Sequence, residues 1–155
     1  LKNGGQTSGN LFNLEFASIK KMETILQKQI IKYRKIYENK DDGYIKSWPK
    51  KFKLWGWIIV INSEGKLLPH MHKEGWLSSS IYLKRPKKKS NHDGDIKFSL
   101  HGANYPSDGK VFNDKTVSIE QGDIVMFPSS LFHSTVPFNS SENRVTLAFD
   151  LMEIP

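Results

Sequence analysis

The chain has 155 residues, 37% of them hydrophobic and 12% aromatic, which is enough for one domain with its own core. The absence of cysteine excludes disulfides, thiolate metal sites and cysteine nucleophiles, and it agrees with a reducing, cytoplasmic compartment. The net charge of +7 comes largely from dispersed lysines, so we expect no nucleic-acid partner, and the longest apolar run, residues 55–61, is too short to cross a membrane.

The beginning of the chain is rich in glycine, asparagine and serine. We expect residues 1–12 to be a flexible lead-in to a single domain that covers residues 13–155. Between residues 14 and 37, apolar side chains recur every three or four positions, and lysines occupy much of the rest. This period predicts one amphipathic helix. A coiled-coil helix is the alternative, but a single helix that precedes many strands more often packs on its own sheet.

Short strands separated by turn residues follow Trp48 and Pro49. We predict eight of them, at residues 52–62, 67–72, 77–84, 96–100, 115–119, 123–127, 133–136 and 144–152. A dense basic run at residues 85–89 has a composition that favours a solvated loop over a contact for an acidic partner. About eight short strands in a chain of this size indicate a β-sandwich or a jelly roll.

The last predicted strand has one polar and one apolar face. Arg144, Thr146 and Ala148 share the first face, whereas Val145, Leu147, Phe149 and Leu151 share the second. A helix that covers the apolar face would leave the polar side chains to line a cavity. Because buried polar groups need hydrogen-bond partners, such a cavity implies a polar ligand. Periodicity alone does not decide which face lies inside.

Three histidines offer a metal site that would decide between the two faces. His70 and His72 are two residues apart, so they lie on one face of the strand predicted there. His133 opens a later strand, as a third ligand from a converging strand would. Imidazole suits iron, zinc, copper and nickel. On its own, a His-x-His pair is more often a pair of exposed side chains beside a turn than a metal site. His92 and His101 lie in polar stretches, and we assign both to the surface.

An arginine follows the third histidine by eleven residues, across a turn of polar residues. Hairpin geometry would place Arg144 on the strand beside His133, facing the same cavity. A guanidinium in an enclosed site binds a carboxylate through two parallel hydrogen bonds. Thr146, on the same face, and Tyr82 can add hydroxyl donors.

These motifs carry a family resemblance. The segments Pro69-His70-Met71-His72, Phe127-Pro128 with His133, and Arg144-Val145-Thr146 resemble those of the 2-oxoglutarate- and Fe(II)-dependent oxygenases. The resemblance extends from about Trp48 to the C-terminus and is closest for a poorly characterised bacterial and phage branch, sometimes fused to tetratricopeptide repeats. It implies a mainly β fold with an N-terminal helix, a double-stranded β-helix of the jelly-roll or cupin type. It also implies iron at the three histidines, and 2-oxoglutarate whose distal carboxylate meets Arg144, assisted by Tyr82 and Thr146.

Two features depart from the family pattern. His72 stands where most relatives have Asp or Glu, so three neutral ligands would leave the iron with its full charge. The run of serines at residues 78–80 replaces the usual Ser-Gly-Val and makes the pocket wall more polar. Glu74 is an alternative carboxylate ligand, although the turn between it and His72 argues against this role.

The resemblance implies a hydroxylase whose substrate, a small molecule or a peptide, and whose oligomeric state the sequence does not define. Two other functions stay open: a three-histidine dioxygenase or isomerase that uses no 2-oxoglutarate, and a non-catalytic jelly-roll binding module. Trp57, Trp76 and Phe127 are candidates for the walls of a substrate pocket, but each is more often core packing.

Overall fold

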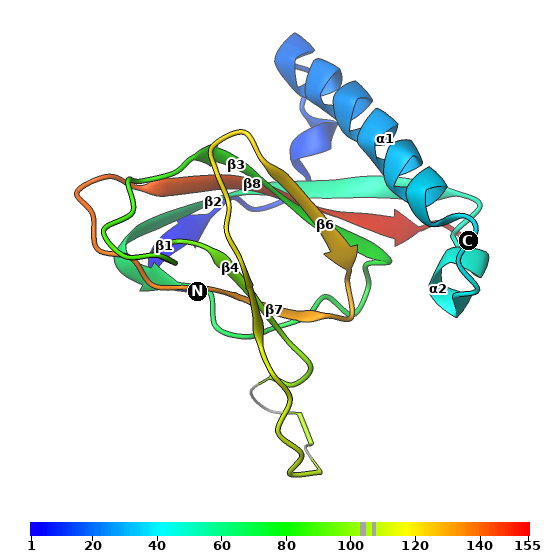
Figure 1. Cartoon of the computed structure of the whole chain (residues 1–155). Helices are drawn as coiled ribbons and strands as arrows, with labels where there is room; N and C mark the ends of the chain where they lie inside the picture. Colours follow the sequence, from blue (N-terminus) through cyan, green and yellow to red (C-terminus); the bar gives the residue numbers. More distant parts are fainter. Residues whose placement is uncertain (103–104, 107) are drawn as a thin grey trace.

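Two antiparallel sheets and an N-terminal helix make up the molecule in the computed structural model, which describes residues 1–102, 105–106 and 108–155 (Figure 1). The larger sheet has five strands in the order β1 (Lys2–Gln6), β2 (Phe52–Lys66), β8 (Arg144–Glu153), β3 (Leu77–Lys84) and β6 (Ile124–Pro128). The smaller sheet has three strands in the order β5 (Lys115–Val117), β4 (Ile96–Ser99) and β7 (Phe132–Thr135). In the described part of the chain, no helix has the length and apolar character that spanning a bilayer requires.

Helix α1 (Ala17–Tyr37) lies on the side of the larger sheet opposite to β7 (Figure 1). Its buried Leu26 and Ile30 share one apolar core with Leu147, Phe149 and Leu151 of β8. This packing confirms the prediction that the helix covers the apolar face of the last strand. Val145, which we expected in the same patch, is half-buried and lies outside this core.

The helix begins at Ala17 rather than at residue 14, because the chain before it is already folded. A 3-10 helix, η1 (Leu11–Asn13), places Phe12 in the apolar core against Gly56 of β2. A Cβ atom at Gly56 would lie 2.5 Å from the Phe12 ring, so this contact requires glycine. A short helix that the sequence did not predict, α2 (Gly43–Lys46), follows α1.

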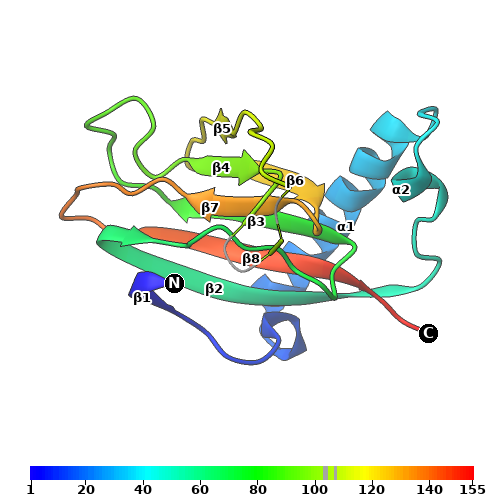
Figure 2. The ribbon, with the colours of Figure 1, turned by 90° about the horizontal axis from the view of Figure 1, so that it is seen from below.

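Residues 1–12, which their composition predicts to be a flexible lead-in, instead form β1 and η1. Strand β1 pairs with β2 at the edge of the larger sheet (Figure 2). All five of its residues are exposed, so the backbone makes the pairing and no apolar period announces it. Gly4 lies so close to β2 that a Cβ atom would be 2.3 Å from the carbonyl oxygen of Val60.

The strand predicted at residues 67–72 is wrong. Strand β2 continues through the expected turn to Lys66, and the segment from there to β3 is irregular. Within it, His70 forms an isolated antiparallel bridge to His133 of β7. Pro69 has no N–H to donate, which removes one hydrogen bond that a regular ladder would need.

The hairpin predicted between the strands of His133 and Arg144 is also wrong. Strand β7 pairs with β4, whereas β8 lies between β2 and β3 in the other sheet. The connection crosses from one sheet to the other, and its Phe138 is buried in a small cluster with Ile59 and Ile61. Arg144 and His133 therefore face one cavity from opposite sheets instead of from neighbouring strands.

The basic run at residues 85–89 is only partly solvated, which corrects the prediction of a simple solvated loop. Asp95 is fully buried, and its carboxylate lies 2.8 Å from Lys88 Nζ and 3.1 Å from His92 Nδ1. The side chain of Arg85 is 8% exposed and lies at the edge of the same cluster. Part of the positive charge therefore compensates a buried carboxylate. His92 and His101 are exposed, as predicted.

Leu26→Ala should lower the free energy of unfolding by about 2–5 kcal/mol, because it opens a cavity in the core between α1 and β8. Ile31→Ala is the matched control on the same helix: Ile31 is 66% exposed, and we expect a change within about 0.5 kcal/mol. Urea unfolding followed by circular dichroism measures both. Equal effects of the two substitutions would mean that α1 does not dock on the sheet through Leu26.

Candidate metal centre

Three histidines from distant parts of the chain meet between the two sheets. His70 and His72 come from the irregular segment after β2, and His133 comes from β7. One nitrogen of each lies within 4.8 Å of the others. The backbone N–H of His70 donates to the carbonyl of His133 at 3.1 Å, and that of His133 donates back at 2.9 Å. The structure therefore brings together the three histidines that the sequence singles out, with a reciprocal backbone bridge holding two of them.

Hydrogen bonds at the back of the rings fix which nitrogen faces the shared space. His70 Nδ1 lies 2.7 Å from the carbonyl oxygen of Leu68, and His133 Nδ1 lies 3.1 Å from that of Leu131. The ring of His72 is held in the same way by a carboxylate. Because these oxygens only accept, each Nδ1 carries the proton and each Nε2 lone pair is free. All three imidazoles are thus in the tautomer that binds a metal through Nε2.

Burial keeps two of these rings neutral. Burial, followed by the proximity of His70, lowers the pKa of His133 from its usual value of 6.5 to about 3. Burial also lowers the pKa of His70. Neutral imidazole is the form that coordinates metal ions, so the site needs no deprotonation of these two rings at neutral pH.

The carboxylate behind His72 belongs to Asp150 of β8, which the sequence analysis missed. Asp150 is 9% exposed, and its Oδ1 lies 2.8 Å from His72 Nδ1 and accepts a hydrogen bond from Ser78 Oγ at 2.6 Å. The hydroxyls of Ser78 and Ser129 lie 2.8 Å apart. Since Ser78 gives its single proton to the carboxylate, Ser129 is the donor between the two serines. Four side chains thus form one chain of hydrogen bonds that ends on His72.

The alternation of β8 offered a signal for Asp150. It stands two residues beyond Ala148, in the set that begins with Arg144. Gly75 allows the close packing around it, because a Cβ atom there would lie 2.5 Å from Ser129 Oγ and 3.1 Å from Asp150 Cγ. The polar face of β8 therefore contributes a carboxylate to the site as well as an arginine.

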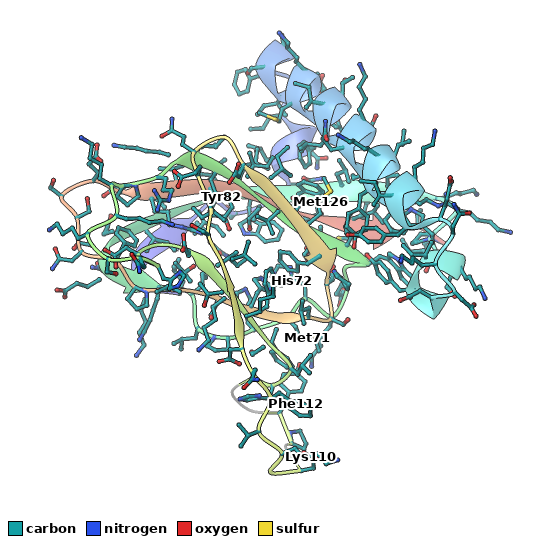
Figure 3. The ribbon with its side chains drawn as sticks, in the orientation of Figure 1. Met71, His72, Tyr82, Lys110, Phe112 and Met126 are labelled. Atoms are coloured by element: carbon teal, nitrogen blue, oxygen red, sulfur yellow. The ribbon has the colours of Figure 1, made fainter. Side chains whose placement is uncertain are left out.

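The histidines line one cavity of about 530 Å³ with polar residues of β3 and β8. Figure 3 shows His72 on the side of the larger sheet that faces away from α1. Arg144 also lines this cavity; it is 3% exposed, and its Nε donates to the carbonyl of Gly94 at 3.0 Å. Among the described residues it has no acidic side chain within ion-pair distance. The cavity therefore contains a buried cation with no carboxylate in direct contact, and the nearby buried Asp95 acts on it only from beyond ion-pair distance.

The surroundings of Arg144 make it available to an anion. Burial lowers its pKa, as expected for a cation that lacks a carboxylate partner. Tyr82 lies beside it, with the guanidinium carbon 4.9 Å from the ring centroid. Burial raises the pKa of Tyr82 to about 12, so the phenol stays protonated. Its hydroxyl is buried and, within the described part of the chain, makes no hydrogen bond of normal geometry. Thr146 lines the cavity directly, whereas Tyr82 lies behind the wall.

Two of the three aromatic residues considered for the pocket walls are found there. Phe127 and Trp57 line the cavity beside the histidines. Trp76 instead stacks on Tyr44, with ring centroids 5.3 Å apart, and packs against the core beneath α1.

A second, more open hollow of about 660 Å³ adjoins the histidines. His72 and Trp57 line both hollows, and Trp55, Glu74 and Asp150 line the outer one. Glu74 is exposed and does not belong to the cluster of metal-binding atoms that the described residues form. The carboxylate that approaches the centre is therefore Asp150, behind a histidine, and not Glu74.

Comparisons with known proteins agree with this geometry. A family described as "Putative 2OG-Fe(II) oxygenase" matches residues 56–150, and no curated protein matches the sequence. A Pseudomonas putida prolyl-4-hydroxylase structure has a TM-score of 0.61 and 13% identity, over 98% of this chain and 72% of that one. A viral collagen prolyl hydroxylase from Paramecium bursaria Chlorella virus-1, complexed with 2-oxoglutarate, has a TM-score of 0.62 and 12% identity, over 99% of this chain and 81% of that one. HygX from Streptomyces hygroscopicus, with nickel and 2-oxoglutarate bound, has a TM-score of 0.52 and 15% identity, over 66% of this chain and 56% of that one.

At these identities the structural likeness establishes the fold, and it confirms the predicted double-stranded β-helix with its N-terminal helix. The family match runs from β2 to β8 and includes the three histidines and Arg144. Because this match covers more than half of the chain, the protein belongs to the 2-oxoglutarate- and Fe(II)-dependent oxygenases, an enzyme family whose cofactors are iron and 2-oxoglutarate.

Proposed function

We propose that His70, His72 and His133 hold the Fe(II) ion and that Arg144 binds the distal carboxylate of 2-oxoglutarate. One observation carries this proposal: a single cavity is lined by three clustered histidines and by a buried guanidinium with no carboxylate within ion-pair distance. When bound, iron supplies oxygen activation, in which 2-oxoglutarate and O₂ become succinate and CO₂ and the second oxygen atom hydroxylates a C–H bond. The protein is then a hydroxylase.

The donor set fits iron. Three imidazoles, each with its Nε2 atom free, suit a divalent transition metal, and they approach from one side. The described part of the chain adds no carboxylate to this cluster, so positions remain for a chelating co-substrate and oxygen. Phe127 and Trp57 add apolar surface to the cavity wall beside the rings.

The opposite sheet fits a carboxylate. The planar guanidinium of Arg144 can donate two parallel hydrogen bonds, and burial makes these bonds stronger than in water. Thr146, which is 1% exposed and lines the same cavity, offers a hydroxyl two residues along β8. The ring of Tyr82 packs against the guanidinium, 4.9 Å from its carbon atom, and helps to hold the arginine in place, while the Tyr82 hydroxyl has no hydrogen-bond partner of normal geometry among the described residues.

The outer hollow gives the substrate a route to the metal, because it meets the inner cavity at His72 and Trp57. The similar structures include two prolyl hydroxylases and HygX with hygromycin B bound, so a peptidyl or small-molecule substrate fits this class of site. The lack of cysteine supports a reducing compartment, and the cytoplasmic location stays a prediction.

Protein reconstituted with Fe(II) should convert 2-oxoglutarate into succinate in the presence of oxygen, slowly even without its own substrate. Succinate measured by chromatography, with metal-free protein as the control, checks this outcome. Iron-loaded protein that neither binds 2-oxoglutarate nor forms succinate would instead favour the three-histidine dioxygenase, or the non-catalytic binding module.

Arg144→Ala should weaken 2-oxoglutarate binding by about 2–5 kcal/mol, or roughly thirty- to several-thousand-fold, because it removes a buried charge-assisted pair. Metal affinity should stay nearly unchanged. Calorimetric titration of the metal-loaded protein measures the effect, and Arg34→Ala, an exposed arginine of α1, is the matched control. An Arg144→Ala protein that binds 2-oxoglutarate as tightly as the parent would make the arginine structural.

His72→Ala should show the reverse pattern: the metal is lost first, and 2-oxoglutarate binding falls only as a consequence. The reason is that this substitution removes one of three metal donors and leaves Arg144 in place. Titration with Fe(II) under anaerobic conditions, followed by 2-oxoglutarate, separates the two effects. His101→Ala, at an exposed histidine outside the cluster, should bind both like the parent. Unchanged iron binding by His72→Ala would remove this residue from the site.

A further inference from the structure

The proposed site leaves the charge of its metal uncompensated. Three neutral imidazoles contribute no negative charge, whereas an Asp or Glu at the position of His72 would lower the net charge by one. The inference below rests on the proposed function, because it assumes that His72 is a metal ligand. It concerns Asp150, a side chain that no metal-binding cluster of the described residues includes.

Asp150 is itself a buried charge that lacks a cation. His72, at 2.8 Å, donates a hydrogen bond to it, and no lysine or arginine in the described part of the chain lies within ion-pair distance of it. A buried carboxylate is costly unless a positive group or several donors stabilise it. A divalent cation on Nε2 of His72 would lie on the other side of that ring. The His72 imidazole therefore lies between a carboxylate that has no cation beside it and a proposed metal site that has no anionic ligand.

Comparison of the three rings shows that a carboxylate is not needed simply to hold a histidine. The Nδ1 atoms of His70 and His133 are bound by the backbone carbonyls of Leu68 and Leu131, each two residues before its histidine. Only His72 has a charged acceptor. Its acceptor, Asp150, comes from β8 and is itself positioned by the hydroxyls of Ser78 and Ser129, although a backbone carbonyl would be enough to orient the ring.

We propose that Asp150 supplies, through His72, the negative charge that an all-histidine iron site lacks. Asp150 is then a positioning residue: it never touches the metal, but its hydrogen bond makes His72 a stronger donor and lowers the effective charge of the centre. The serines keep the carboxylate in place, since Ser78 donates to the same oxygen that receives the His72 proton.

Asp150→Asn is the decisive variant, because it removes the charge, keeps the size of the side chain and retains an oxygen that can accept the His72 proton. We expect anaerobic Fe(II) titration to show about tenfold to hundredfold weaker binding. In metal-saturated protein, the affinity for the dianion 2-oxoglutarate should stay equal or rise, because the centre has become more positive. The Fe(III)/Fe(II) midpoint potential should also rise, because the lost negative charge weakens the binding of Fe(III) more than that of Fe(II). The rise is about 59 mV for each factor of ten between these two losses of affinity.

Two further variants control for folding. Asp41→Asn makes the same chemical change at an exposed aspartate that pairs with Lys46 near α2, and it should leave all three quantities unchanged. Ser78→Ala removes a hydrogen bond to the carboxylate without removing charge, so its loss of Fe(II) affinity should be smaller than that of Asp150→Asn. Thermal unfolding of every metal-free variant shows which ones retain the fold.

The outcomes separate this inference from the proposed function. Asp150→Asn protein with the parent's Fe(II) affinity and potential would overturn the inference, and so would a lower affinity of the metal-saturated variant for 2-oxoglutarate than the metal-saturated parent shows. A third result is that Asp150→Asn binds iron more weakly and has a raised potential, while neither the parent nor any variant binds 2-oxoglutarate. That result would support the role of Asp150 and overturn the co-substrate assignment. A parent chain that does not bind Fe(II) would overturn both.

Discussion

Strand β8 is buried on both faces, and this constraint places every other part of the site. One alternate set, with Leu147 and Phe149, packs beneath α1, while the other set, with Arg144 and Asp150, faces the cavity side. A shift of one residue in the pairing with β2 and β3 would exchange the two sets. The shift would bury a guanidinium and a carboxylate under the helix and put large apolar side chains beside the histidines. Core packing and site geometry therefore specify the same register.

The segment that carries His70 and His72 is irregular, yet its backbone is extensively paired. His70 exchanges two hydrogen bonds with His133, and the N–H of His72 donates to the carbonyl of Ser129 at 2.9 Å. The N–H of Trp76 donates to Leu151 of β8 at 2.7 Å. Paired backbone groups hold a segment as firmly as a regular ladder does, because each broken bond would leave a buried polar group unsatisfied. The segment is thus tied to both sheets, which lets His70 and His72 reach one point without being on a strand.

The sequence predicted the features that depend on side-chain chemistry and missed those that depend on the backbone. Alternation in β8 separated its two faces, and the histidines rather than the periodicity indicated which of them faces the cavity. Strand β1 was not predicted, because its residues are exposed and its pairing with β2 is made by the backbone. Glycine at position 4 allows the two backbones to approach closely. The pairing of β7 with β4 depends on the course of a long loop, which no local pattern encodes. Asp150 stands two residues beyond the predicted polar set of β8, but only the fold brings it to His72, 78 residues earlier.

The charges of the cavity make its two ligands interdependent. Without them, the described part of the chain leaves Arg144 with no carboxylate within ion-pair distance and Asp150 with no lysine or arginine within that distance, in a region of low dielectric constant. A divalent metal at the histidines compensates Asp150 and adds positive charge near Arg144, which by itself favours a dianion. A dicarboxylate that contacts both the metal and Arg144 then compensates the remaining charge. The coupling of two ligands is reciprocal, so 2-oxoglutarate must strengthen metal binding by the same factor by which the metal strengthens 2-oxoglutarate binding. In the proposed three-histidine site, charges placed outside the ligand set would thus restore affinity that the lack of a carboxylate ligand removes.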